Sequence, residues 1–275
     1  MSDLPPFSPV FNRLLASLAN EDVSLAEVAD IIEKDAVIAG TVLKLVNSAL
    51  YGRRGSVTSI RHASSLLGMN RLRNAVLGLS IARMWNHVKT PPEWSMARFN
   101  LHSVGVAILA DLLAQRRPVE FPEGAFLAGL FHDLGKLLVA IGLKADYSAI
   151  IAEYELGSRR YLDCEREIIG CDHTELSAAA VALWRIPEPV RLAVAHHHSS
   201  QVIAGSVPYG TYSLAAVLEC ADLYVHSTGV TIERQRSEAE QSLEDPFAML
   251  GISADAHHVL EEFEAEYDAL TLFFR

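Results

Sequence analysis

Residues 130–138 read Leu-Phe-His-Asp-Leu-Gly-Lys-Leu-Leu, and this stretch says most about the fold. Its apolar run predicts a buried helix that starts near Pro122 and passes through Lys136. Within it His132 and Asp133 stand side by side, about 100° apart around a helix, and Lys136 shares a face with His132. A buried ionised carboxylate costs free energy unless it is paired or binds a metal. For a single such pair, the ordinary alternative is a core histidine held by its neighbour.

Further candidate ligands lie on other predicted helices. They are His102, His173, the triplet His196, His197 and His198, and Asp222. Imidazole and carboxylate groups are ligands for borderline or hard divalent ions. Because a separate helix delivers each of them, the sequence predicts that several helices converge on one metal pocket.

The order of these residues resembles the HD superfamily, whose members bind metal through the series H…HD…D. His102, His132, Asp133 and Asp222 match that series one for one. The resemblance implies that these four residues hold a first divalent ion, which is Fe, Mn, Ni or Zn.

The binuclear branch of the superfamily, typified by HD-GYP phosphodiesterases, is similar further along the chain. Lys136 matches its lysine after the HD pair, His173 its single histidine, and the triplet its paired histidines. The stretch from Trp184 to Val194 sets a register in which His197 and His198 form the pair, with His196 as the alternative. The resemblance implies that His173, His197 and His198 complete a second metal site or orient substrate. The chain lacks the Gly-Tyr-Pro element, so hydrolysis of cyclic dinucleotides is not expected.

The first half resembles the HDOD family. The matching stretches are Asn47-Ser-Ala-Leu-Tyr-Gly52, Ser59-Ile-Arg-His-Ala63 leading to Leu67-Gly68, and Leu72-Arg-Asn-Ala-Val76. With the Gly-x-Asp-His and Trp-x-x-Pro segments, the resemblance covers roughly residues 5–225. HDOD modules are generally regulatory, and many have lost HD ligands. This sequence keeps them.

Helical signals recur along the chain, which predicts an all-α protein. Ser24 with Glu27 forms a capping box, and Asp35 and Ser59 can each cap a further helix. Thr90-Pro-Pro92 breaks the pattern. We expect an N-terminal helical subdomain over residues 1–91, packed on an HD-type helical bundle over residues 92–275. The bundle helices are expected at about 93–115, 122–136, 145–156, 161–169, 172–184, 187–197, 212–226 and 253–273.

Composition predicts a cytoplasmic protein. Half of the 275 residues are apolar and 21% are charged, which is ample for a core. The chain opens without a basic region and apolar run, so no signal peptide is expected, and no uninterrupted apolar stretch approaches the ~20 residues of a membrane helix. The cysteine count of three, without a C-x-x-C pair, is typical of thiols in a reducing compartment.

Charge is distributed unevenly. Residues 36–92 contain eight Lys and Arg and no Asp or Glu, although the whole chain has a net charge of −11. Two oppositely charged halves that attract each other are the ordinary explanation. The alternative is a surface for an anionic partner, such as a nucleotide or an acidic signalling protein. Nucleic acid is disfavoured, because no recognisable nucleic-acid motif is present and the whole chain is acidic.

The last expected helix carries an apolar stripe, which consists of Leu260, Phe263, Tyr267, Leu270 and Phe274. Such a stripe can form a dimer seam. One this short more often packs on its own domain.

Two functions fit this sequence. The first is metal-dependent phosphoester hydrolysis by a metal-bound water, with Asp133 and Lys136 as catalytic residues and Lys136 contacting the phosphate. The second is a non-catalytic regulatory scaffold that binds a metal or nucleotide and a protein partner. For Lys136 itself, a solvated lysine on the helix surface is an equal alternative.

Overall fold

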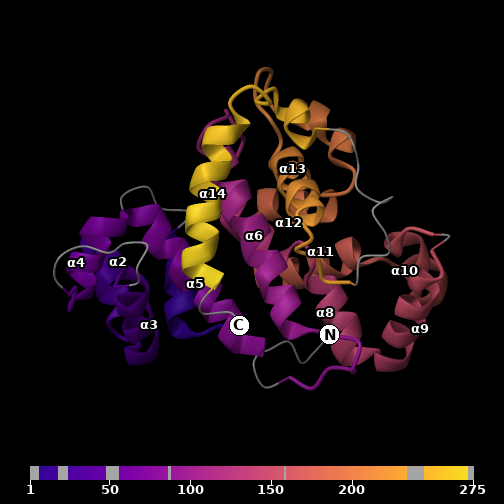
Figure 1. Ribbon diagram of the computed structural model, residues 1–275, viewed down its shortest axis with the longest axis horizontal. Coiled ribbons are helices and arrows are strands. Elements are labelled where there is room, and N and C mark those ends of the chain that lie inside the picture. The colour runs from indigo at the N-terminus through magenta and orange to yellow at the C-terminus, as the bar shows by residue number, and fades with distance from the viewer. Residues whose placement is uncertain are drawn as a thin grey trace. The chain divides into compact units, whose positions relative to one another are not determined.

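The computed structural model consists of helices joined by turns (Figure 1). It describes residues 6–17, 24–47, 56–85, 88–157, 159–233 and 245–271. Within these ranges the one strand-like feature is an isolated bridge between Val119 and Tyr212. The predicted all-α fold class is therefore confirmed.

The chain divides into two compact units. The N-terminal unit comprises Met1–Asn86 together with Glu264–Arg275, and the central unit comprises His87–Phe263. The end of the chain thus belongs with its beginning, which the sequence pattern did not suggest. The division into folding domains at residues 91 and 92 stays a prediction.

The N-terminal unit contains α1 (Pro9–Ser17), α2 (Leu25–Ile32), α3 (Ala36–Val46), α4 (Ile60–Leu67) and α5 (Met69–Trp85). The three predicted caps are confirmed. Ser24 and Glu27 form the capping box of α2. The side chain of Asp35 accepts from two backbone amides of α3, and that of Ser59 accepts from one of α4. Gly68 ends α4 with φ of 80°, a conformation that glycine adopts at little cost. Residues 48–52 of the first HDOD-like stretch lie outside the described residues.

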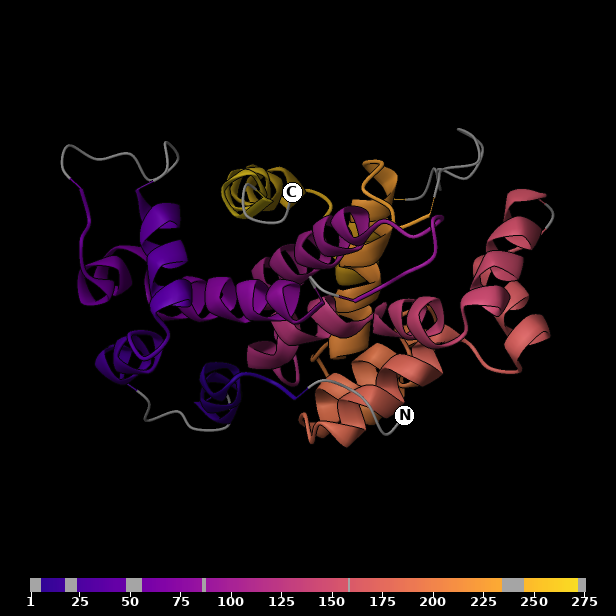
Figure 2. The ribbon, with the colours of Figure 1, turned by 90° about the horizontal axis from the view of Figure 1, so that it is seen from below.

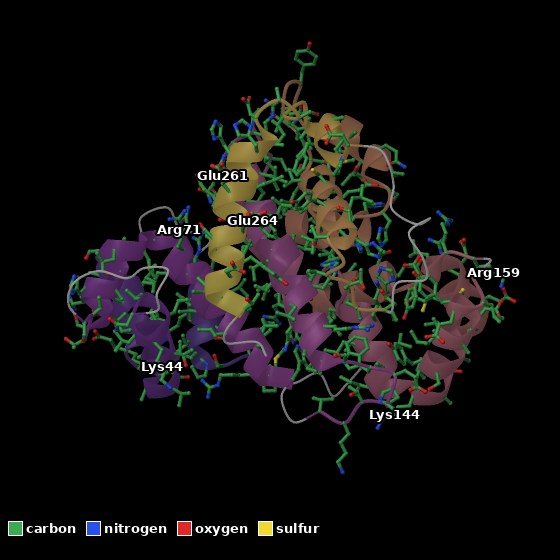
Figure 3. The ribbon with its side chains drawn as sticks, viewed as in Figure 1. Lys44, Arg71, Lys144, Arg159, Glu261 and Glu264 are labelled. Carbon is green, nitrogen blue, oxygen red and sulfur yellow. The ribbon has the colours of Figure 1, made fainter. Side chains whose placement is uncertain are left out.

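Several basic side chains of residues 36–92 pair with carboxylates inside the N-terminal unit. Arg61 lies 2.6 Å from Asp30, and Arg83 lies 3.7 Å from Asp35. Arg71, labelled in Figure 3, lies 2.5 Å from Glu266 on α14 (Ala256–Thr271). These three basic side chains therefore have carboxylate partners within their own unit, and a partner surface on residues 36–92 stays a prediction. Arg53 and Arg54 lie outside the described residues.

The central unit contains α6 (Met96–Ala114), α7 (Ala125–Phe131), α8 (Leu134–Gly142), α9 (Lys144–Glu155), α10 (Tyr161–Ile169), α11 (His173–Leu183), α12 (Glu188–Ala195) and α13 (Leu214–Ser227). α6 packs on α7 and α13, while α11 packs on α8 and α12. α9 and α10 form a helical hairpin, and the two helices lie side by side in both views (Figures 1 and 2).

Two glycines allow the central helices to approach closely. A Cβ added to Gly129 of α7 would lie 2.3 Å from the Cα atom of Ala107 on α6. A Cβ added to Gly135 of α8 would lie 2.2 Å from the carbonyl oxygen of His173 on α11. Real side chains do not tolerate such distances to backbone atoms, so glycine is required for this packing.

The single helix expected from Pro122 through Lys136 is wrong. The helix breaks at His132 and Asp133, which form a turn between α7 and α8. Asp133 has φ of −100° and ψ of 12°, outside the helical region. The backbone amide of Gly135, which has no acceptor within α8 because it lies in the first turn, donates to the hydroxyl of Ser177 at 2.7 Å. A side chain distant in sequence thus stabilises the break.

Two helical stretches of the central unit are long and apolar enough to span a membrane, judged by length and composition alone. They are Met96–Ala114 and Pro122–Gly142, of which 78% and 89% are buried within the fold. A core helix passes the same test, so they are weak evidence for a membrane span.

The apolar stripe of the last helix packs on its own chain where it is described. Phe263 is buried, and its ring meets that of Tyr224 on α13, with the ring centres 6.0 Å apart. Leu270 is also buried. This favours packing on its own domain over a dimer seam. Phe274 lies outside the described residues.

Candidate metal centre

The candidate ligands come together from five parts of the central unit. α6 supplies His102, the turn between α7 and α8 supplies His132 and Asp133, the first residue of α11 is His173, the turn after α12 supplies His197 and His198, and α13 supplies Asp222. The side chains are buried, except that of His198, which is 32% exposed. Solvent therefore reaches the group mainly beside His198.

The first cluster is formed by His102, His132, Asp133 and Asp222. The Nε2 atom of His102 lies 3.2 Å from Nε2 of His132 and 3.2 Å from Oδ1 of Asp222. The Oδ2 atom of Asp133 lies 3.5 Å from Nε2 of His102 and 3.4 Å from Nε2 of His132. His102, His132 and Asp222 thus bring three donor atoms within 4.8 Å of one another, at spacings that suit ligands of a single ion, and Oδ2 of Asp133 lies beside them.

The second cluster is formed by His173, His197 and His198. The Nε2 atoms of His173 and His198 lie 3.2 Å apart. The Oδ1 atom of Asp133 lies 3.2 Å from Nε2 of His173 and 3.8 Å from Nε2 of His197. Asp133 therefore turns one oxygen toward each cluster and joins them.

The residues fit a divalent metal by their ligand types, and also because some of their buried polar atoms have no hydrogen-bond partner. Several buried side-chain atoms of the described residues have no hydrogen-bond partner, and two of them, Oδ1 of Asp133 and Nε2 of His197, lie within the joined clusters. Buried polar atoms almost always have partners, and a bound ion is one explanation for those that do not. Both atoms point into the joined clusters.

The orientation of the histidines supports the same interpretation. The Nδ1 atoms of His102, His132 and His197 each lie 2.8 Å from a backbone carbonyl oxygen, those of Val230, Gly129 and Val194. Each carbonyl can only accept, so Nδ1 donates and carries the proton. The Nε2 lone pairs are then free to bind a metal, which is the usual arrangement of metal-binding histidines.

The histidines of the two clusters differ in the direction of their pKa shifts. Burial opposes protonation of His132, but Asp133 and Asp222 outweigh it and raise its pKa to about 10. Burial would raise the pKa of Asp133, yet Lys136 and His132 hold it well below its usual value. Burial lowers the pKa of His197 well below its usual value, and the nearby His198 adds to this. The imidazole of His197 is therefore neutral at neutral pH, and an ion bound in the first cluster would replace a proton on His132.

Lys136 is buried and paired, so the solvated lysine considered from the sequence is not what the structure shows. Its Nζ atom lies 3.0 Å from Oδ2 of Asp133 and 3.1 Å from Oε1 of Glu233. It also lies 4.9 Å from the ring centre of Tyr161. Burial opposes its charge, but Asp133 and Glu233 raise its pKa well above the usual value.

The structure distinguishes among the histidine triplet. His197 and His198 face the second cluster, as the register predicts. His196 lies outside both clusters, with Nδ1 3.4 Å from the hydroxyl of Ser199.

Two buried glutamates of the pocket, Glu165 and Glu233, were not predicted from the sequence. Glu165 lies on α10, is fully buried, and accepts from the backbone amide of His173 and from its Nδ1 atom, at 3.0 Å and 2.6 Å. It orients His173 as the carbonyls orient His102, His132 and His197. In the sequence, Glu165 is recognisable only as a glutamate eight residues before His173. A spacing of eight across two helices matches no helical pattern, so it does not identify the residue.

Replacing Glu165 with alanine should weaken metal binding about 10–100-fold, because His173 then loses the group that fixes its tautomer and ring orientation. Metal titration of the purified variant measures this. Glu167→Ala, at an exposed position on the same helix, is the matched control and should bind metal as the unaltered protein does. Equal affinity of the two variants would exclude an orienting role for Glu165.

Comparison with known proteins assigns the chain to a family. A model of the HDOD domain matches residues 4–200. An HDOD domain protein of unknown function from Geobacter sulfurreducens has a similar structure, with a TM-score of 0.78 at 24% identity over 99% of this chain and 92% of that one. A candidate phosphohydrolase from Shewanella amazonensis gives a TM-score of 0.74 at 24% identity over 100% and 96% of the two chains. At these identities the likeness shows the fold alone.

An uncharacterized protein of Treponema pallidum is 24% identical over 214 residues. The match covers 72% of this chain but 38% of that protein, so the chain spans well under half of this relative. The family match covers residues 4–200, which is well over half of the chain. The chain therefore belongs to the HDOD family.

Proposed function

We propose that this HDOD protein binds one or two divalent transition metal ions, Fe, Mn, Ni or Zn, in the joined clusters and hydrolyses a phosphoester. The observation that carries the proposal is the pair of buried unsatisfied atoms, Oδ1 of Asp133 and Nε2 of His197, inside a ring of oriented imidazoles. When bound, such an ion lowers the pKa of water and polarises a phosphoryl oxygen.

The residues have separate tasks in this proposal. His102, His132 and Asp222 hold one ion, and His173, His197 and His198 hold the other or orient substrate. Asp133 joins the two clusters through its two oxygens. Lys136 carries a fixed positive charge 3.0 Å from Asp133, where it can neutralise charge on a phosphoryl group. Substrate enters the pocket from solvent beside the partly exposed side chain of His198.

A second function is a regulatory scaffold in which the same pocket binds metal or a nucleotide without turnover. One observation favours it: Lys136, the residue expected to contact phosphate, is already paired with Glu233. In either function we propose a cytoplasmic location, since the three cysteines, all of them described, are free thiols. A signalling protein that binds residues 36–92 remains part of the proposal.

The test is metal analysis of the purified protein together with a phosphoester screen in added manganese, iron, nickel or zinc. We expect about one to two metal equivalents per chain and turnover of at least one ester class. His197→Ala should lower metal content, whereas His257→Ala, at an exposed position on α14, should not. A metal-loaded protein that is inactive on every ester would identify a scaffold.

A further inference from the structure

Residues 230–233 follow α13 and lie against the candidate metal pocket. We call this segment the strap. Its Val230 carbonyl accepts from Nδ1 of His102 at 2.8 Å, and its Ile232 carbonyl accepts from Nε of Arg98 at 2.8 Å. The hydroxyl of Thr231 donates to the carbonyl of Glu233 at 2.7 Å. Thr231, Ile232 and Glu233 are buried. The strap is therefore fixed on α6, and its last residue reaches the pocket.

The carboxylate of Glu233 occupies the partner position on Lys136. Its Oε1 atom lies 3.1 Å from Nζ of Lys136, and the side chain is 8% exposed. The other contacts of Nζ are Asp133 at 3.0 Å and the face of the Tyr161 ring at 4.9 Å. The oxygens of Asp133 also face the two clusters of candidate ligands. Glu233 is therefore the partner of Lys136 that an incoming anion would replace.

A carboxylate and a phosphoryl oxygen compete for the same ammonium, because both accept charge-assisted hydrogen bonds. Glu233 also adds a negative charge to a pocket that already holds Asp133, Asp222 and Glu165. Repulsion between charges grows with the charge of the ligand. A dianionic phosphate is therefore opposed more strongly than a monoanionic diester.

We propose that Glu233 is a specificity-determining residue that competes with anionic ligands for Lys136 and disfavours dianionic phosphates relative to monoanionic phosphodiesters. The inference rests on the proposed function, because that function gives the reason for a phosphoryl group to enter. This role explains why Lys136, the residue proposed to contact phosphate, is paired with the carboxylate of Glu233 in the structure.

Calorimetric titration of the full chain with inorganic phosphate and with dimethyl phosphate, at mildly alkaline pH, tests this. Glu233→Gln keeps the shape of the side chain and removes its charge. We expect it to lower the Kd for inorganic phosphate about ten-fold or more and to lower the Kd for dimethyl phosphate less. Glu155→Gln, an equal charge change at an exposed position of α9, should leave both constants unchanged. Equal Kd values for Glu233→Gln and the unaltered protein, or equal gains for both ligands, would overturn the inference.

Metal content, measured on the same samples, separates this inference from the proposed function. A protein that takes up no metal contradicts the proposed function, whereas the gain of Glu233→Gln for phosphate is expected with and without metal, since it acts through Lys136. Hydrogen exchange of the unaltered protein gives a second measurement that does not depend on a variant folding. Phosphate should speed exchange at residues 231–233, because the carboxylate of Glu233 then loses its partner Lys136, and unchanged exchange on saturation with phosphate would contradict the competition for Lys136.

Discussion

Asp133→Ala should abolish metal binding in both clusters at once, with a loss of affinity of more than about 100-fold, and with it any phosphoester hydrolysis. The reason is that the two oxygens of Asp133 face the two clusters, Oδ2 toward His102 and His132 and Oδ1 toward His173. Asp222 bridges less closely, since its Oδ2 atom lies 3.9 Å from Nδ1 of His198. Loss of an orienting group alone costs about 10–100-fold, so loss of a shared ligand should cost more.

The same substitution should also destabilise the metal-free protein. Asp133 offsets the buried charge of Lys136, and removing one partner of a buried pair costs about 3–5 kcal/mol. Because its pKa is lowered in the folded protein, its stabilising contribution is present at neutral pH and is lost as the pH falls through the folded pKa. Thermal unfolding and metal titration measure the two effects. Asp255→Ala, at an exposed turn position, is the control. An Asp133→Ala protein that still binds one equivalent of metal would contradict the shared role.

Gly135→Ala should have the second largest effect, on stability and on the second cluster together. Its Cβ would lie 2.2 Å from the carbonyl oxygen of His173 and 2.7 Å from its Cα. Backbone atoms cannot move aside cheaply, so α8 and α11 must separate and carry His173 away from Asp133. We expect a loss of about 3 kcal/mol or more, which corresponds to a fall in Tm of roughly 6–12 °C for a unit of this size.

The matched control for Gly135→Ala lies on the same helix. Gly142 has nothing within 4 Å of an added Cβ, so Gly142→Ala should leave the Tm unchanged or raise it slightly, since alanine favours helix. Calorimetry measures both variants, and metal titration shows whether the second cluster weakens. A Gly135→Ala protein as stable as Gly142→Ala would mean that the two helices do not pack as described.

The sequence predicted the helices well where a local rule applied. Ser24, Asp35 and Ser59 cap their helices because a side-chain oxygen and a nearby amide are enough to form a cap. The break at His132 and Asp133 was not predictable, since its stabilising hydroxyl comes from Ser177, more than forty residues later in the chain. Neither was the pairing of Arg71 with Glu266.

The candidate ligands were all selected by residue type and order, and the structure brings the chosen seven together. The residues that orient or seal them were missed, because their positions depend on tertiary contacts. Glu165 meets His173 through the turn between α10 and α11. Glu233 meets Lys136 from a strap nearly one hundred residues away in sequence. Nothing local to either glutamate distinguishes it from a surface residue.

The most direct test of the central claim is anomalous scattering from crystals of the protein grown with manganese. We expect one or two peaks within ligand distance of His102, His132 and Asp222 on one side and of His173 and His197 on the other, with Asp133 contacting each ion. No peak among these side chains in a manganese-saturated crystal, or a peak that Asp133 does not contact, would contradict it.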